Sequence, residues 1–211
     1  MIVYLHADSL QKQPALAHSM FTDRAKQFKE RLGWDVSVNS KGEERDQYDA
    51  LNPLYVIWQE PGGGHGGSMR FLPSTGRTMT NEHFLHLTGG VRIESPFIWE
   101  CTRFCLAEGA GSQTAAALML AGAELMRGHG IKHFLGVFDA PMARVYRHIG
   151  ASPEVLGSAG AGRAKTSVGL WAYTPAAKAR LVAKAGVSEA AMRLWYERAF
   201  GARPKAKSAV A

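Results

Sequence analysis

The chain has 211 residues, 46% of them hydrophobic, which is enough to bury the core of one domain. Its longest apolar stretch, residues 114–126, is shorter than the roughly 20 residues that cross a bilayer, and no charged-then-apolar signal sequence opens the chain. We therefore expect a cytoplasmic protein without membrane insertion. The formal net charge of +7 favours an acidic partner, but no run of Lys and Arg interleaved with aromatic residues argues for nucleic acid.

The first half of the chain predicts one amphipathic helix and three strands. The helix stops near Gly33, and on it Arg24 and Phe28 are four residues apart and share a face. In chain order the pattern predicts a strand at 2–7, the helix at 13–34, an irregular polar segment at 35–53, and strands at 54–60 and 67–73 joined by a glycine-rich hairpin loop.

The second half continues the alternation of helices and strands. It predicts a strand at 96–106, a long helix from Ser112 to Gly128 or Gly130, a strand at 131–138, a short helix from Asp139 to Gly150, a strand at 165–173, and one or two helices within 175–200. We therefore expect an α/β (α+β) domain of one curved mixed sheet with helices on both faces. This domain covers residues 1–202, and residues 203–211 form a basic, disordered tail.

The two cysteines, Cys101 and Cys105, fall within the predicted strand at 96–106. Their spacing suits neither a C-x-x-C redox pair nor a four-ligand zinc site. We expect two free thiols, buried or half-buried, and no metal.

Asp46 and Asp49 stand three residues apart in the irregular segment, behind Arg45 and with Tyr48 between them. Short Asp side chains favour turns because they hydrogen-bond to nearby backbone groups. The pair is therefore typical either of a turn or of a binding site, and both interpretations stay open on these residues alone.

Several unusual residues follow one another in a recognisable order. The runs "RAKQF", "DQYD", "SMRFLP", "HFLHL" and "WECTRFC" contain most of them. In this order and spacing the chain resembles the acyl-homoserine lactone synthases, the LuxI-type autoinducer synthases, over residues 1 to 175. The residues that carry the resemblance are Arg24, Phe28, Trp34, Asp46, Asp49, Arg70, Phe84, Glu100 and Arg103.

The resemblance implies a GNAT-like fold and an acyltransferase that makes N-acyl-L-homoserine lactone, a quorum-sensing signal. The substrates would be S-adenosyl-L-methionine and an acyl thioester on acyl carrier protein or coenzyme A, and methylthioadenosine would be released. It implies no cofactor. Glu100, Arg103 and Asp46 would be catalytic, Glu100 by holding a base or an ordered water. The S-adenosylmethionine site would comprise Arg24, Phe28, Trp34, Asp46, Asp49, Arg70 and Arg103.

Structural interpretations compete with these roles. Arg24 could lie on a solvated helix face, Phe28 and Trp34 could be core residues, and the charged residues could form one buried ion network. Strict alternation places Glu100 and Arg103 on opposite faces of their strand, so they share a face only if the strand is bulged between them.

The resemblance also implies an apolar acyl pocket lined by Phe84, Cys101, Phe104, Leu118 and Gly136. A Thr at the position of Gly136 tends to accompany 3-oxo acyl groups in the family, so Gly136 argues against that preference. A small residue there leaves room for a longer, branched or 3-hydroxy chain.

Two other functions remain as alternatives. One is a GNAT-type N-acetyltransferase that uses acetyl-CoA. Its R/Q-x-x-G-x-G/A pattern would use Gly109 and Gly111, but Leu106 stands where Arg or Gln is expected. The other is a non-catalytic basic binding module, supported by the net charge alone. The sequence does not set the oligomeric state, although we favour a monomer.

Overall fold

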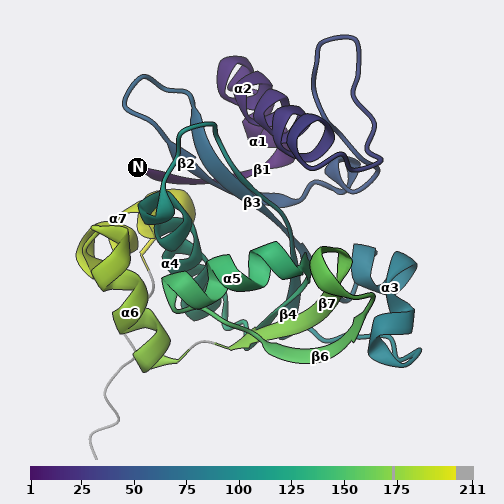
Figure 1. Ribbon diagram of the computed structural model, residues 1–211. Coiled ribbons are helices and arrows are strands. Elements are labelled where there is room, and N and C mark those ends of the chain that lie inside the picture. Colours follow the sequence, from purple (N-terminus) through teal and green to yellow (C-terminus); the bar gives the residue numbers. More distant parts are fainter. Residues whose placement is uncertain (173, 203–211) are drawn as a thin grey trace, which may run out of the picture.

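The computed structural model describes residues 1–172 and 174–202 and is built on a sheet of seven strands (Figure 1). The predicted tail at 203–211 lies outside the described residues. The strands lie in the order β1-β2-β3-β4-β5-β7-β6, and of the described pairs that of β4 with β5 is parallel and the others antiparallel. Their bounds are β1 Ile2–His6, β2 Leu54–Gln59, β3 His65–Pro73, β4 Ile98–Leu106, β5 His133–Asp139, β6 Glu154–Ala159 and β7 Thr166–Ala172. The predicted mixed sheet is confirmed.

Helices cover both faces of this sheet (Figure 1). The short α1 (Ala7–Leu10) and α2 (Pro14–Ala25) pack on one face, against a core that includes Tyr55 and Ile57 of β2. The larger core lies on the other face, beneath α4 (Ser112–His129), α5 (Ala140–Ile149), α6 (Pro175–Ala185) and α7 (Glu189–Phe200). None of the helices in the described part of the chain combines the length and hydropathy that a membrane span requires.

Four local elements differ from the sequence prediction. The helix expected at 13–34 ends as an α-helix at Ala25 and continues as a π-helical turn, Lys26–Arg31, in which the Leu32 N–H donates to the Gln27 carbonyl at 3.1 Å. The structure adds the short α1, α3 (Met79–His83) and β6, which the sequence did not predict. β6 is an edge strand with mostly exposed residues on both faces, so it lacks the alternation that predicts a strand.

Two irregularities in β4 position the site. β4 pairs with β5 over only three residues, from Ile98 to Glu100, and the two strands diverge beyond that point. β4 is also bulged, because Ser68 pairs with Cys105 whereas Arg70 pairs with Thr102, which leaves one extra residue on β4. Arg103 lies in this bulge and has a left-handed backbone conformation, with a φ of 51°.

Candidate active site

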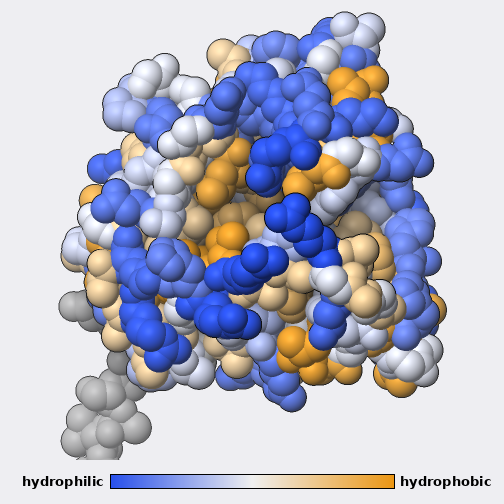
Figure 2. Space-filling model, in the orientation of Figure 1, coloured by the Kyte–Doolittle hydropathy of each residue, from blue (hydrophilic) through white to orange (hydrophobic). Residues whose placement is uncertain are grey.

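A cavity of about 630 Å³ opens where β4 and β5 diverge. Figure 2 shows a hollow in this face of the molecule, with hydrophobic side chains at its floor and hydrophilic ones around it. One end of the cavity is polar and is lined by Glu44, Arg45, Asp46, Gln47 and Arg103. The other end is apolar and is lined by Met69, Phe71, Met119, Phe134, Phe138, Tyr146 and Trp171. A ligand with a charged part and a hydrocarbon part fits such a cavity.

Six charged side chains form a network behind and along the polar end: Arg24, Arg70, Arg103, Glu44, Asp46 and Asp49. Arg24, buried on α2, donates from Nε to Glu44 Oε2 at 2.6 Å and from Nη1 and Nη2 to the two Asp49 oxygens at 3.0 Å each. The helix-face interpretation of Arg24 is therefore wrong, because its guanidinium is buried and faces carboxylates.

Arg70 holds the two aspartates together from β3. Its Nη1 donates to Asp46 Oδ1 at 2.5 Å and to Asp49 Oδ1 at 2.7 Å, and its Nε donates to Thr102 Oγ1 at 3.0 Å. Tyr55 adds an O–H donor to Asp49 Oδ1 at 2.6 Å. The buried guanidinium therefore has a partner on three sides.

The two aspartates also shape the segment that carries them. Asp46 Oδ1 accepts the backbone N–H groups of Tyr48 and Asp49, at 2.9 and 3.2 Å, and Asp49 Oδ2 accepts the N–H of Asp46 at 2.9 Å. The turn interpretation of the Asp pair is therefore confirmed, and the same carboxylates also face the arginines. The binding-site interpretation stays a prediction.

Glu44 is the member of the network that the sequence did not predict. Its side chain is fully buried, and it joins Arg24 to Arg103, whose Nη2 donates to Glu44 Oε1 at 2.9 Å and lies 2.8 Å from Asp46 Oδ2. With Glu44 included, three guanidinium groups face three carboxylates. The formal charges of the network therefore balance.

The pKa of Asp49 shows how strongly this network favours ionised carboxylates. Burial alone would raise that pKa, but the charges of Arg24 and Arg70 outweigh burial and hold it well below its ordinary value. Asp49 is therefore ionised at neutral pH and contributes a full negative charge to the network.

An aromatic pair borders the polar end. Phe28 and Trp34 stack in parallel, with ring centroids 5.1 Å apart, and the Arg103 guanidinium lies 5.5 Å from the Phe28 centroid. Phe28 is buried, whereas Trp34 is 41% exposed and lines the cavity. Trp34 is therefore no core residue, and its ring is open to a planar ligand.

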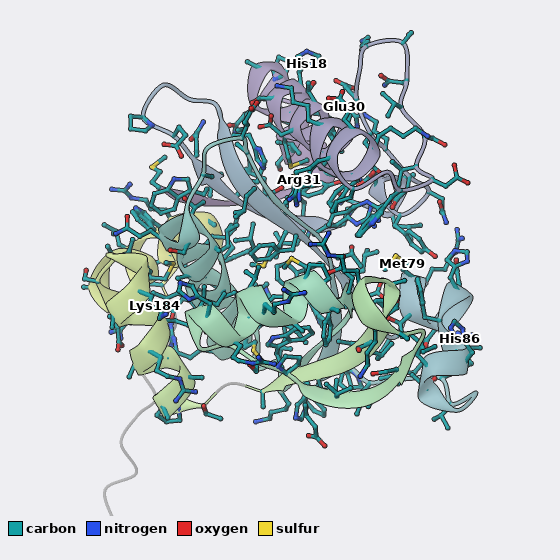
Figure 3. All side chains as sticks on the ribbon, in the orientation of Figure 1. His18, Glu30, Arg31, Met79, His86 and Lys184 are labelled. Atoms are coloured by element: carbon teal, nitrogen blue, oxygen red, sulfur yellow. The ribbon has the colours of Figure 1, made fainter. Side chains whose placement is uncertain are left out.

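The bulge in β4 decides where Glu100 and Arg103 point. Because of the bulge, the neighbouring residues Thr102 and Arg103 both contact the network. The bulge that a shared face for Glu100 and Arg103 requires is therefore present. Glu100, however, does not line the cavity: its carboxylate accepts the N–H groups of Met79 and Thr80, at 2.9 and 2.6 Å. Glu100 thus holds the first turn of α3, where Met79 is labelled in Figure 3.

Burial raises the pKa of the Glu100 carboxyl above its ordinary value, although hydrogen bonds from Thr80 and Met79 oppose the rise. Its side chain makes no contact with Arg103 in the described network, whose carboxylates are Glu44, Asp46 and Asp49. The two charged residues of the E-x-x-R motif therefore have separate structural roles: Glu100 binds the backbone of α3, and Arg103 belongs to the charged network.

Of the residues expected in an acyl pocket, Phe84, Cys101, Phe104 and Gly136 line the cavity. Leu118 does not, because it is buried on the side of α4 that packs against Gly67, and Met119 and Gly122 face the cavity in its place. The expected free space beside Gly136 is also occupied. A Cβ there would lie 3.1 Å from both the Cys101 carbonyl oxygen and the Trp171 ring, so the glycine allows that ring to approach.

Both cysteines are free thiols, as predicted, with Cys101 half-buried and Cys105 buried. Burial raises the pKa of Cys105 to about 12, so this thiol is neutral at physiological pH. Among the described residues no group of three or more His, Cys, Asp or Glu is arranged to hold a metal ion.

The sequence of this chain is similar to those of known proteins. Residues 8–181 match the autoinducer synthase family. An acyl-homoserine-lactone synthase from Rhizobium etli is 40% identical over 181 residues, which cover 82% of this chain and 85% of the relative.

Two solved structures share the fold. A coenzyme A-dependent acyl-homoserine lactone synthase, BjaI, solved with S-adenosylmethionine and isopentyl-CoA, has a TM-score of 0.78 at 23% identity, over 90% of each chain. A putative N-acetyltransferase from Lactobacillus plantarum has a TM-score of 0.56 at 15% identity, over 82% of this chain and 98% of the other, which confirms the GNAT-like fold. The family match and the Rhizobium etli relative show that the chain belongs to the autoinducer synthase family, the LuxI-type acyl-homoserine lactone synthases.

Proposed function

We propose that this cavity joins S-adenosyl-L-methionine to an acyl thioester and releases N-acyl-L-homoserine lactone and methylthioadenosine. In the first step the amine nitrogen attacks the thioester carbonyl, the carbon–sulfur bond breaks and the thiol leaves. In the second, a carboxylate oxygen attacks the γ-carbon and the sulfonium leaves as neutral methylthioadenosine. The observation that carries the proposal is the network, which presents Glu44, Asp46 and Arg103 to a cavity with an apolar far end.

The polar end suits S-adenosylmethionine group by group. Its ammonium and sulfonium find the carboxylates of Asp46 and Glu44, and its own carboxylate finds the Arg103 guanidinium. The exposed face of Trp34 offers a stacking surface for the adenine ring. Arg24, Arg70 and Asp49 do not line the cavity and act by fixing these three cavity-facing groups.

The two chemical steps ask different things of the protein. The ammonium must lose a proton before attack, and we assign this proton to Asp46, a carboxylate of the cavity wall, or to a water that it holds. Glu100 is too committed to the α3 backbone for this task and serves as a positioning residue for the wall that α3 contributes. Ring closure joins two atoms of one molecule, so a fixed fold of the bound substrate supplies much of its rate.

The acyl donor is proposed to approach over α5. A groove lined by Arg144, Arg147, Lys165 and two serines lies against Phe138, which also lines the cavity. These three cations are exposed, and none forms an ion pair with the described residues. They can attract the acidic surface of an acyl carrier protein or the phosphates of coenzyme A, which the BjaI structure contains as isopentyl-CoA.

The test is direct. The purified full chain is incubated with S-adenosylmethionine and a panel of acyl carrier protein and acyl-CoA thioesters, and methylthioadenosine is measured. We expect release with at least one donor, and none without a donor. If the folded protein released no methylthioadenosine with any acyl donor, the proposal would be contradicted. Acetylation of amines from acetyl-CoA without S-adenosylmethionine would support the N-acetyltransferase alternative instead.

A further inference from the structure

Helix α5 brings a tyrosine, Tyr146, into the apolar wall of the cavity. The residue is only 6% exposed, and its ring packs edge-on against Phe104, Phe138 and Trp171, at centroid distances of 6.1, 5.6 and 5.0 Å. All four of these side chains line the cavity. Tyr146 therefore belongs to the wall that an acyl chain would touch.

Within the described part of the chain, nothing forms a hydrogen bond with the Tyr146 hydroxyl. The oxygen is nevertheless not fully covered by protein atoms, unlike the unpaired hydroxyls of Thr22 and Thr80. Other buried tyrosines differ: Tyr4 donates to the Ala121 carbonyl at 3.1 Å, Tyr48 to Glu82 at 2.8 Å and Tyr55 to Asp49 at 2.6 Å. Among these four, Tyr146 alone has a hydroxyl without a partner in the described residues, and it is the one of them in the apolar wall of the cavity.

Such a group carries a cost when the cavity fills. A polar atom covered by hydrocarbon loses its water and gains no partner, whereas an oxygen on the ligand would restore the bond. Burial raises the pKa of Tyr146 well above its ordinary value, so the phenol stays protonated, acts as a hydrogen-bond donor and is a poor source of protons.

We propose that the Tyr146 hydroxyl donates a hydrogen bond to an oxygen substituent on the acyl chain, so that this enzyme prefers oxygenated acyl donors over unsubstituted donors of equal length. The oxygen is that of a hydroxyacyl or of an oxoacyl group, which accept the same bond. The proposal rests on the proposed function and adds a specificity-determining residue to it.

The test compares Tyr146→Phe with the wild-type chain on three thioesters of equal length: unsubstituted, 3-hydroxy and 3-oxo. Methylthioadenosine release gives kcat/KM for each. We expect the preference for the favoured oxygenated donor over the unsubstituted one to fall about tenfold in Tyr146→Phe, which is about 1.4 kcal/mol. The unsubstituted donor should react as fast as before or faster. The oxygenated thioester, 3-hydroxy or 3-oxo, whose preference falls in Tyr146→Phe is the one whose oxygen accepts the hydrogen bond.

Tyr4→Phe is the matched control, because it removes a buried hydroxyl that does not line the cavity. It should leave the preference unchanged. Tyr146→Phe should also melt no lower than the wild-type chain, because the free protein loses no hydrogen bond. An equal loss of kcat/KM for all three donors, or an unchanged preference, would overturn the proposal. Absence of turnover by the wild-type chain with every donor would instead contradict the proposed function.

Discussion

Glu44 connects two arginines that come from distant parts of the chain, one on α2 and one on β4. Without its carboxylate, Arg24 would keep only Asp49, and Arg103 would keep only Asp46. Arg24 lies where water cannot replace the lost partner, since it is 1% exposed, whereas Arg103 faces the cavity and would lose the carboxylate that fixes its position. Glu44 is therefore needed to hold the cavity-facing end of the network.

The neighbouring residue offers a matched comparison for Glu44. Glu43 pairs instead with His18 and Arg45, whose side chains are about half exposed. We expect Glu44→Gln to lower the free energy of unfolding by roughly 3 to 5 kcal/mol and to remove most activity. Glu43→Gln should cost less stability than Glu44→Gln, because its charged partners are half exposed, and should keep most activity. Chemical denaturation and methylthioadenosine release measure both effects, and equal behaviour of the two variants would contradict the special role of Glu44.

Glu43 also predicts a pH dependence. Burial would raise its pKa, but hydrogen bonds from His18, Arg45 and Asn39 lower it to about 2, from 4.5. A lowered folded-state pKa stabilises the protein fully above the unfolded value, and this contribution is lost as the pH falls from about 4.5 to about 2. The melting temperature of Glu43→Gln should therefore fall less steeply than that of the wild-type chain over this interval. If the melting temperatures of the two proteins fell in parallel below pH 4.5, the stabilising role of the ionised Glu43 would be contradicted.

Substitutions of three residues, Asp46, Arg103 and Cys105, distinguish the effect of charge on activity from the effect of packing. Asp46→Asn and Arg103→Ala should remove activity, because each takes away a charge that faces the bound substrate. Cys105→Ser should largely keep it, since this neutral thiol takes no part in the chemistry. Circular dichroism must accompany the assays, because an unpaired charge in the network can unfold the protein. A folded but inactive Cys105→Ser would show that the thiol is not inert.

The sequence predicted the network only in part. Asp46, Asp49 and the three arginines stand out because the family motifs contain them. Glu44 lies in the run Glu43, Glu44, Arg45, and such a run of charges is typical of a solvated surface. Only the fold reveals that one member points inward, and only packing reveals that the Tyr146 hydroxyl lacks a partner.

At the scale of elements, the bulge in β4 changes which residues share a face. In a regular strand Cys101 and Cys105 would point to the same side. Here Cys101 lines the cavity, whereas Cys105 lies close enough to Arg24 for that charge to act on its pKa. The bulge falls at Arg103 rather than at a glycine, so the sequence gives no local signal for it.

The contact between β4 and α3 gives a prediction for Glu100. In Glu100→Gln the amide retains one acceptor oxygen for the two N–H groups of Met79 and Thr80. We expect a loss of about 2 kcal/mol in stability and a raised KM for the acyl donor, because Met79 and Phe84 line the cavity. Steady-state kinetics and thermal melting check both. A large fall in kcat with unchanged stability and KM would instead show that Glu100 acts as a base.

At the scale of the whole molecule, the two ends of the chain supply different parts of the site. Residues before 106 contribute the charged network, and residues after 133 contribute the basic groove and, together with Phe71 and Phe104, the aromatic end. The net charge of +7 contains no contribution from the network, where positive and negative groups balance. The excess charge therefore lies elsewhere, partly in the groove over α5.

This distribution predicts a salt dependence for the acyl donor. Screening acts over about 8 Å at physiological salt, so raising the salt from about 50 to about 300 mM should weaken the apparent affinity for acyl carrier protein several-fold. A neutral acyl-thioester mimic should hardly respond. Arg147→Glu should weaken carrier protein binding, whereas Arg193→Glu, an exposed residue on α7, should not. Turnover far faster with acyl-CoA than with every carrier protein would assign the groove to the phosphates of coenzyme A.

The balanced network also constrains how this sequence can vary. Any single replacement that removes or reverses a charge among its six members leaves an opposite charge buried without a full set of partners. A descendant of this chain can abandon the arrangement only by changing two or more of these positions together. We therefore expect the six residues to be inherited or lost as a block. Laboratory evolution toward different substrates should begin at Trp34 or in the apolar end of the cavity, where single replacements carry no such penalty.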